Sequence, residues 1–290
     1  MSSFKIVTDS TADLPVDYLR ENDITEFFLP ATIKGETYRT QDELPLEKFY
    51  SFMRAGEPTK TSQVNPEEAK EGFVKLIESG CKEILYIAFS SGLSGTYNSG
   101  RIAADELKET YPDVKIIVID TKAASLGEGL LIYYAVELRK EGKTIDETAK
   151  WVEDHKLNLV HIFTVDDLNH LYRGGRVSRS AAFIGTVLSI KPILHVDDEG
   201  HLIPIGKSRG RKKSLLELVD YMGEHMGSFK DQNKVFFISH GDCLDDAKFV
   251  RDEVASRYGI KNCVINTIGY TIGAHAGPGT VALFFLGDER

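Results

Sequence analysis

The residues with the clearest chemical potential lie in one loop. Residues 84–89 form an apolar run of strand length, and residues 90–96 follow with the sequence Ser-Ser-Gly-Leu-Ser-Gly-Thr. From about Ser94 onward the pattern becomes helical, so this loop joins a buried strand to the first turn of a helix. Unpaired N–H groups and the positive end of the helix dipole favour an anion there. We therefore expect an anion-binding loop; the alternative is that Ser94 serves only as the helix N-cap.

The residues missing from this loop narrow the kind of anion. A P-loop requires Gly-x-x-x-x-Gly-Lys-Ser/Thr, and no lysine is present here. A nucleophile elbow requires Gly-x-Ser-x-Gly, whereas residues 92–96 read Gly-Leu-Ser-Gly-Thr. Neutral donors without a cation suit a single carboxylate better than a triphosphate.

Other polar residues stand at positions where ligands often bind. Asp9 and Ser10 follow an apolar strand at residues 4–7, at the sheet edge where open α/β folds gather ligand residues, although they equally suit capping of the next helix. Thr61 lies in a polar loop between two prolines, where its hydroxyl is typical of a turn. His275 lies in a loop of small residues that would let a ligand approach closely, and a structural role is its alternative.

Charge and cysteine content limit the function classes. The chain of 290 residues has a net charge of −9, which argues against nucleic acid as the main partner. Two basic stretches stand out on the acidic chain: residues 172–178, a glycine-rich loop with two arginines, and residues 207–213, where five of seven residues are cationic. The three cysteines form no C-x-x-C motif and suggest a reducing compartment. With no signal-peptide pattern and no apolar run near the ~18 residues of a membrane span, we expect a cytoplasmic protein without an integral membrane segment.

The elements that must position these residues change in character along the chain. In the first half, buried strands alternate with helices, which predicts a parallel sheet covered on both faces. In the second half, a hairpin at residues 192–207 and several further strands predict an α+β arrangement. An apolar helix is expected at residues 181–189.

Several short stretches, taken together and in order, resemble the DegV family of bacterial fatty-acid-binding proteins that serve fatty acid kinases. The matching stretches are residues 7–11, 61–63, 90–97, 166–168, 173–176, 191–194, 209–213 and 272–275. They span almost the whole chain, which makes the resemblance more specific than any one of them.

The resemblance implies an α/β protein with two domains. Residues 1–160 would form a three-layer α/β/α domain with a parallel sheet and the Thr-Ser and Ser-Gly carboxylate-binding loops. Residues 161–290 would form a two-layer α/β domain with a mixed, largely antiparallel sheet, an apolar tunnel and the basic loops.

The resemblance also implies a ligand, a long-chain fatty acid such as a C16–C18 acid, with no metal or other cofactor. Its carboxylate would be held by Thr61 and Ser94, with Ser62, Ser91 and His275 as neighbours. Burying a C16 tail at ~0.8 kcal/mol per CH₂ offers on the order of 10 kcal/mol before costs, so the tail can dominate affinity. The head group then needs only hydrogen bonds.

In the family, the bound carboxylate is presented to a separate ATP-dependent fatty acid kinase. The resulting acyl phosphate stays on the binding protein, and a downstream acyltransferase uses it for phospholipid synthesis. The chain would therefore not be an enzyme on its own. Four arginines are expected to face the kinase or steady the new phosphate, a solvated basic face being the alternative: Arg173, Arg176, Arg209 and Arg211.

Two rival functions follow from the same residues. A serine hydrolase acting on a lipid ester would use Ser94, His275 and a carboxylate such as Asp9, although the elbow spacing disfavours it. A nucleic-acid-binding protein would use the Arg/Lys loop, against the overall acidity.

Overall fold

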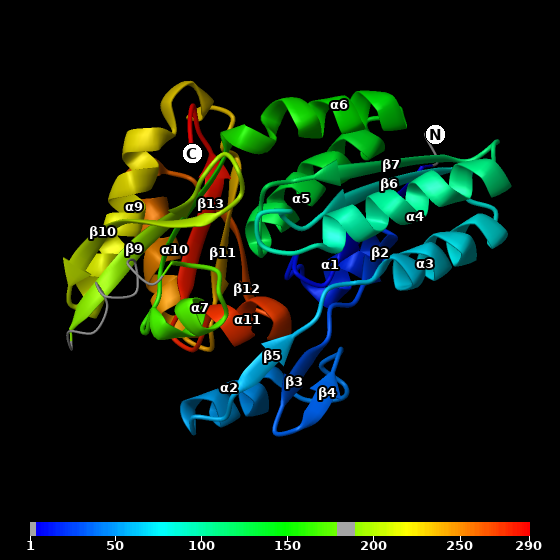
Figure 1. The fold of residues 1–290 in the computed structure, drawn as a ribbon. Helices are drawn as coiled ribbons and strands as arrows, with labels where there is room; N and C mark the ends of the chain where they lie inside the picture. The colour runs from blue at the N-terminus through cyan, green and yellow to red at the C-terminus, as the bar shows by residue number, and fades with distance from the viewer. Residues whose placement is uncertain (1–3, 179–188) are drawn as a thin grey trace.

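The computed structural model describes residues 4–178 and 189–290. The helix expected at residues 181–189 therefore lies almost entirely outside the described residues. A parallel sheet forms the first half of the molecule, with strand order β2–β1–β6–β7 (Figure 1). Its strands are β1 (Lys5–Asp9), β2 (Ile24–Phe27), β6 (Glu83–Ala88) and β7 (Lys115–Asp120).

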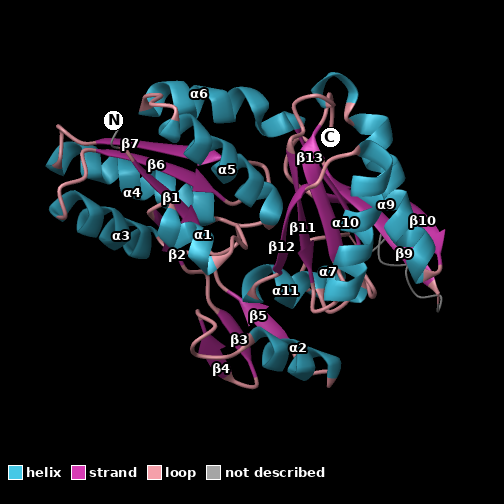
Figure 2. Cartoon of the chain, turned by 180° about the vertical axis from the view of Figure 1, so that it is seen from behind, coloured by secondary structure: helices cyan, strands magenta, loops and turns pink. Residues whose placement is uncertain are grey.

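Helices cover both faces of this sheet, which gives the expected three layers (Figure 2). Alternate side chains of β6 enter two separate hydrophobic cores: Tyr86 packs in one and Ile87 in the other. The core around Tyr86 is closed by α3 (Pro66–Glu78) and α4 (Thr96–Thr110). The core around Ile87 is closed by α1 (Val16–Glu21), α5 (Leu126–Lys140) and α6 (Ile145–His155).

The second sheet is mixed, with strand order β10–β9–β8–β13–β11–β12. Its strands are β8 (Leu159–Thr164), β9 (Ile190–Val196), β10 (Leu202–Arg209), β11 (Val235–His240), β12 (Asn262–Thr267) and β13 (Val281–Leu286). The pair β11–β12 is parallel and the other pairs are antiparallel. This sheet and the parallel sheet confirm the predicted fold class.

The two faces of the mixed sheet have different neighbours. One face is covered by α9 (Arg211–His225) and α10 (Leu244–Tyr258). The other face packs against α5, which also contacts the parallel sheet. Thus α5 belongs to the hydrophobic core of both halves. The predicted domain boundary at residue 160 stays a prediction. Among the described residues, no helix combines the length and apolar composition needed to cross a membrane.

A third, small sheet protrudes from the body of the molecule and was not predicted (Figures 1 and 2). It has the order β4–β3–β5 and carries one helix. Its elements are β3 (Ala31–Ile33), β4 (Glu36–Tyr38), α2 (Leu46–Arg54) and β5 (Thr59–Thr61). The remaining short elements are α7 (Asn169–Arg173), α11 (Tyr270–Ala276) and the 3-10 turns η1 (Lys156–Asn158) and η3 (Gly227–Phe229).

Two expectations about loops were wrong, and both concern this small sheet. Thr61 ends β5, paired with Ala31 of β3, instead of lying in an irregular loop. His275 lies in the last turn of α11 instead of in a loop. The small sheet packs on α11, since the hydroxyl of Thr59 in β5 donates to the Ala274 carbonyl of α11 at 3.0 Å. The packing of β5 on α11 brings Thr61 to the site described next.

Candidate functional site

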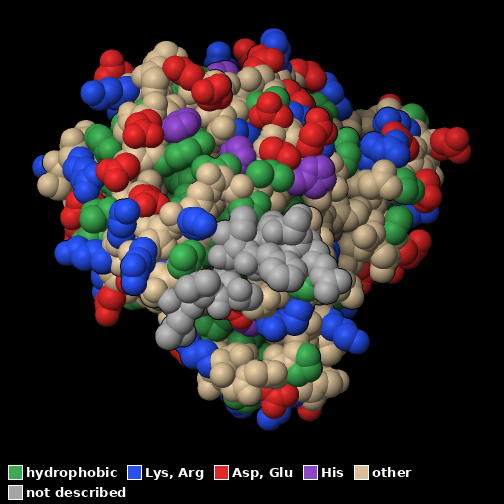
Figure 3. Space-filling view, turned by 60° about the vertical axis from the view of Figure 1, so that its left-hand side comes forward, with side chains coloured by type: hydrophobic (Ala, Val, Ile, Leu, Met, Phe, Trp, Pro, Cys, Tyr) green, Lys and Arg blue, Asp and Glu red, His purple; other side chains and the backbone are tan. Residues whose placement is uncertain are grey.

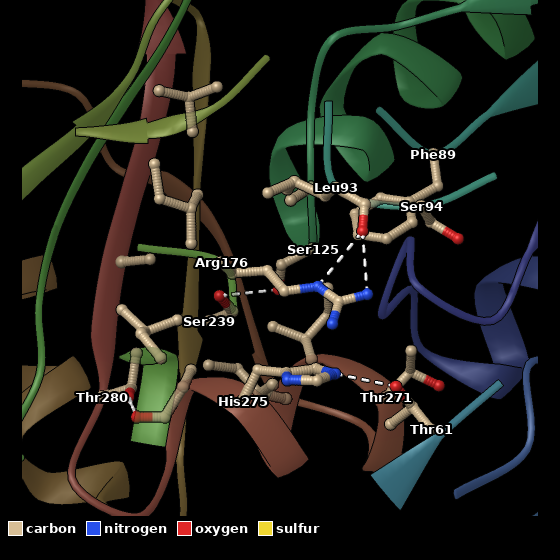
Figure 4. Close-up of a pocket in the computed structure, with 18 of the residues that line it drawn as sticks. Thr61, Phe89, Leu93, Ser94, Ser125, Arg176, Ser239, Thr271, His275 and Thr280 are labelled. Atoms are coloured by element: carbon tan, nitrogen blue, oxygen red, sulfur yellow. Dashed lines mark hydrogen bonds between the residues drawn. The ribbon is translucent and has the colours of Figure 1, made fainter. Parts of the chain in front are cut away.

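A cavity of about 230 Å³ lies between α11, the β6–α4 loop, the start of α5 and one face of the mixed sheet (Figure 4). Most of its wall is apolar. The polar side chains near β5, the β6–α4 loop and α11 are Thr61, Ser62, Gln63, Ser94, Arg176, Thr271 and His275. The apolar wall includes Phe89, Leu93, Phe163, Leu171, Val196, Leu202, Ile272, Ala282 and Phe284. The cavity is therefore amphipathic, with one group of polar side chains where β5, the β6–α4 loop and α11 meet.

Thr61 and His275 form the first contact of this polar group. Thr61 Oγ1 lies 2.7 Å from His275 Nε2, and each residue comes from a different unit of the fold. A second bond, from the Thr59 hydroxyl to the Ala274 carbonyl at 3.0 Å, fixes β5 against α11. The hydroxyl of Thr61 is thus held at the cavity wall by neighbours on both sides.

The imidazole of His275 is neutral at pH 7. Burial, and secondarily the positive charge of Arg176, lower its pKa to about 4. Its Nδ1 faces Gly174 so closely that a Cβ there would come within 2.0 Å of it, and it has no hydrogen-bond partner among the described residues. Because a buried N–H without an acceptor is costly, the proton is favoured on Nε2. Nε2 then donates to Thr61, and the Thr61 hydroxyl proton is left for another acceptor.

Ser94 lies in the predicted loop, just before α4 begins at Thr96. Its hydroxyl is 2.9 Å from the Thr96 hydroxyl and accepts weakly from the Thr96 N–H at 3.3 Å. Gly95 occupies the N-cap position between them. A Cβ at Gly95 would come within 2.2 Å of Gln63 Oε1, so glycine allows this loop to pack against the residues that follow β5. The loop thus reaches Thr61.

Arg176 lies inside the cavity wall, although we expected it to face outward with the other arginines. Gly175, at a φ of 73°, turns the chain between Arg173 and Arg176. The guanidinium donates to the Leu93 carbonyl at 3.2 and 3.1 Å and to the Gly174 carbonyl. Among the described residues it has no carboxylate partner, and burial lowers its pKa. It remains a cation because an arginine does not lose its proton in proteins, so among the described residues the positive charge of the site is not compensated by an anion.

The other residues predicted for the site are more scattered. Ser62 lines the cavity and is exposed. Ser91 is exposed, and Lys122 Nζ donates to its hydroxyl at 2.8 Å; the structure does not bring it into the described wall.

The remaining three arginines differ in their partners. Arg173 and Arg209 are exposed. Arg211 is instead ion-paired with Asp246 at 2.8 Å and lies 3.6 Å from Asp166. Lysine and arginine side chains, interspersed with acidic ones, occupy the face seen in Figure 3. Arg173 and Arg209 are therefore the two of the four that are exposed and have no carboxylate partner among the described residues, although the Arg173 guanidinium contacts His170 Nδ1 at 3.1 Å.

The geometry does not assemble the residues of the hydrolase alternative. The hydroxyl of Ser94 bonds Thr96, and His275 Nε2 bonds Thr61. The Asp9 carboxylate bonds Thr11 and the Phe89 N–H. Within the described part of the chain, none of the three is hydrogen bonded to another, so a nucleophile–base pair is not formed.

Several polar residues of the wall were missed by sequence reasoning. Apart from Gln63 they are Ser125, His161, Ser239, Thr271 and Thr280. The signal for Ser239 was present, since it ends the apolar run at residues 235–238, as Ser90 ends residues 84–89. Ser125 carries no such signal, because it is set by how α5 begins between the two sheets.

The fold and the cavity define a two-domain α/β protein with an internal, largely apolar binding site. A sequence model described as "Uncharacterised protein, DegV family" matches residues 3–288. A DegV domain-containing protein of Clostridium perfringens is 46% identical over 292 residues, which cover 100% of this chain and 99% of that protein. The chain belongs to the DegV family, which confirms the resemblance seen in its motifs.

Solved structures show the same fold over the whole length. One is a DegV family protein from Thermus thermophilus that binds fatty acid. It superposes with a TM-score of 0.86 at 30% identity, and the match covers 98% of this chain and 99% of that chain. A stearic-acid-binding protein from Eubacterium ventriosum has a TM-score of 0.87 at 26% identity, with 98% of each chain covered. DegV from Bacillus subtilis, a fatty-acid-binding protein, has a TM-score of 0.85 at 29% identity and covers 99% of this chain and 100% of its own.

Proposed function

We propose that this protein binds a long-chain fatty acid in the cavity and presents its carboxylate to a partner ATP-dependent fatty acid kinase. The observation that carries the proposal is the pairing of a largely apolar cavity with the half-buried guanidinium of Arg176, which has no anionic partner among the described residues. A partly desolvated cation without an anion is costly, and a carboxylate would compensate it. The fatty-acid-binding relatives support the same ligand class.

The carboxylate would lie between Thr61, Ser94 and Arg176. Thr61 has a hydroxyl proton to give, because His275 donates to its oxygen in the favoured tautomer. The Arg176 guanidinium lies between the Leu93–Ser94 loop and the Thr61–His275 pair (Figure 4), and its charge-assisted donors strengthen hydrogen bonds to an anion. This differs from the expectation of purely neutral donors, and it makes the head group a larger contributor to affinity.

The tail would lie along the mixed sheet, among Phe163, Ala282 and Phe284. These residues come from the neighbouring strands β8 and β13, so the chain would lie across the strands. A relative of this fold that binds stearic acid makes a C16–C18 acid the natural first choice.

After phosphorylation, the protein would carry the acyl phosphate to an acyltransferase for phospholipid synthesis. Arg173 and Arg209 are the arginines suited to meet the kinase or the new phosphate, since they are exposed. Arg211 is held by Asp246 and is better suited to fix the start of α9.

Ligand identification tests the first half of the proposal. Native mass spectrometry of freshly purified protein should show a bound mass that extraction identifies as a long-chain fatty acid. The double variant Thr61→Ala with Ser94→Ala should lose retention without losing its folded circular dichroism spectrum. A matched pair of exposed hydroxyls, Ser51→Ala with Thr110→Ala, should retain the acid. Retention by the first pair equal to wild type would place the head group elsewhere.

Charge reversal tests the second half. Arg173→Glu and Arg209→Glu should abolish acyl phosphate formation by a fatty acid kinase while leaving fatty acid retention intact. Lys230→Glu, an exposed cation beyond η3, is the charge-matched control and should keep full turnover. Unchanged kinase turnover in the arginine variants would refute the assignment of this surface.

A further inference from the structure

A pair of serine hydroxyls lies in the wall of the cavity apart from the residues assigned to the carboxylate. Ser125 stands at the start of α5 and Ser239 on β11, and their Oγ atoms are 2.9 Å apart (Figure 4). Both side chains line the cavity, yet Ser125 is only 4% exposed and Ser239 is 0% exposed. An alkyl tail gains nothing from hydroxyl groups in the wall, so the presence of this pair needs a physical reason.

The position of the pair is enforced by the backbone. Ser125 has a φ of 55° and a ψ of −145°, a region that residues other than glycine rarely adopt. Its hydroxyl also contacts the carboxyl group of Asp13, which itself accepts from the Gly269 N–H at 2.8 Å. Ser125 is thus held between the loop after β1 and β11, and its hydroxyl cannot turn away freely.

A count of the hydroxyl and carboxyl protons shows that the Ser239 hydroxyl can make one more hydrogen bond than it makes. If Asp13 is a carboxylate, Ser125 donates to it, Ser239 donates to Ser125, and Ser239 keeps only acceptor sites. If Asp13 is protonated, all donors reverse and Ser239 keeps its own O–H. In both cases the Ser239 hydroxyl makes no other hydrogen bond among the described residues. A hydroxyl can satisfy either state because it both donates and accepts.

The neighbours of Ser239 place this capacity beside the tail. In the register of the sheet, Ser239 lies opposite Ala282, and Ala282 lies opposite Phe163. All three line the cavity. Because Ala282 is small, the groove floor between Ser239 and Phe163 is low, and a chain lying across these strands would pass next to the serine pair.

We propose that Ser125 and Ser239 form a subsite for a hydroxyl group carried partway along the acyl chain, so that the protein accepts long-chain hydroxy fatty acids. This inference rests on the proposed fatty-acid site, and the carboxylate anchor sets which carbon reaches the subsite. An unsubstituted chain passes the pair and leaves the capacity of Ser239 unused.

A positional series tests this inference on the wild-type protein. Octadecanoic acid and a set of hydroxyoctadecanoic acids, each with its hydroxyl on a different carbon, compete for the site. We expect one position, or two adjacent positions, to bind about tenfold tighter than the others, as a buried hydrogen bond predicts. Equal affinities at all positions, or a steady loss wherever a hydroxyl is added, would overturn the subsite.

The variant Ser239→Ala should abolish the positional preference, so that all hydroxyoctadecanoic acids of the series bind equally. The control is Ser208→Ala, another buried serine on a strand, which lies outside the described cavity wall and should keep the preference. A preference that persists in Ser239→Ala would also overturn the subsite. Failure of folded wild-type protein to bind any of the acids, octadecanoic acid included, would instead refute the proposed function itself.

Discussion

Two loops leave the parallel sheet at the same edge and use their polar residues in opposite ways. The first region is the end of β1 at Asp9 with the loop of residues 10–13, and the second is the loop of residues 89–95 after β6. From the sequence both suit a ligand site, since both follow a buried strand at its carboxyl end. In the structure the polar groups of the first region are buried and hydrogen bonded to other parts of the protein, whereas the second loop borders the cavity.

In the first region the carboxyl group of Asp9 is fully hydrogen bonded by protein donors. Asp9 accepts from the Phe89 N–H at 3.0 Å, the Tyr86 hydroxyl at 3.2 Å and Thr11. The single hydroxyl proton of Thr11 cannot serve both Asp9 and Glu128, which lies 3.0 Å away, so one carboxyl group is protonated. Burial raises the pKa of both carboxyl groups, and that of Glu128 lies well above its usual value.

The second loop depends on the first. The Phe89 N–H that Asp9 accepts belongs to the chain entering residues 90–96, so Asp9 supports the loop that carries Ser94. The second loop meets Arg176, whose charge has no internal partner among the described residues. The comparison teaches that a polar cluster marks a binding site when it leaves charge or hydrogen-bonding capacity unfilled, and a scaffold when it fills them.

The largest expected effect is a pH dependence of stability that comes from Asp13 in the first loop. Burial raises the pKa of Asp13 to about 7 from an unfolded value of 3.8. The folded chain therefore binds more protons between these values, and the free energy of unfolding should fall as pH rises from about 4 to about 7. At about 1.4 kcal/mol per pKa unit, the fall due to Asp13 is on the order of 4 kcal/mol.

Chemical denaturation at a series of pH values checks this contribution. Asp13→Asn removes the titrating group and should make the profile flatter, whereas the exposed Asp17→Asn should keep the wild-type slope. The slope that remains in Asp13→Asn would come from the other carboxyl groups whose pKa values burial also raises: Asp9, Glu128 and Glu26, the last to about 8. Parallel profiles for wild type and Asp13→Asn would show that this carboxyl group does not titrate in that range.

The next effect is the loss of stability when the scaffold loop is broken. Asp9→Ala leaves the Phe89 N–H and the Tyr86 hydroxyl buried without an acceptor. The free energy of unfolding should fall by about 3 kcal/mol, since each unsatisfied buried donor costs roughly 1–3 kcal/mol. Urea denaturation measures it, with the exposed Asp17→Ala as control. A loss below about 1 kcal/mol would mean that the loop after β6 does not depend on Asp9.

The same kind of substitution in the second region should act on binding. Arg176→Leu removes the cation of the site, so fatty acid affinity should fall about 30-fold, as expected for charge-assisted hydrogen bonds. The stability of the ligand-free protein should stay equal or rise, because the substitution removes a half-buried charge that has no ion-pair partner among the described residues. Titration calorimetry with delipidated protein measures the first effect and denaturation the second. A variant that loses stability but keeps affinity would assign Arg176 to the scaffold.

How far the sequence could predict this comparison depends on the range of the interactions involved. The helices at Leu46–Arg54 and Ile145–His155 begin and end where the local pattern places them. The parallel and mixed sheets follow from local alternation and from family motifs. The strand Thr59–Thr61 could not be predicted, because its three residues become a strand only by pairing with Ala31–Ile33.

The sequence predicted the hydroxyl groups near the cavity but not the arginine whose charge lies beside them. Thr61, Ser94 and His275 carry family motifs, and the structure brings them to one cavity. The inward position of Arg176 depends on the turn at Gly175 and on the Leu93 carbonyl, which is distant in sequence. Neither contact leaves a local pattern, and the same is true of the Ser125–Ser239 pair.

The smallest expected effect separates two serines within the second loop. Ser91 and Ser94 belong to one motif, but Ser91 is exposed and bonded to Lys122, whereas Ser94 lines the cavity. Ser91→Ala should change fatty acid affinity by less than about twofold, since exposed polar substitutions have small effects. Ser94→Ala should weaken it by about tenfold, the value of one buried hydrogen bond. Displacement of a fluorescent fatty acid compares the two, and equal losses would mean that the whole loop, and not the hydroxyl that reaches the cavity, determines binding.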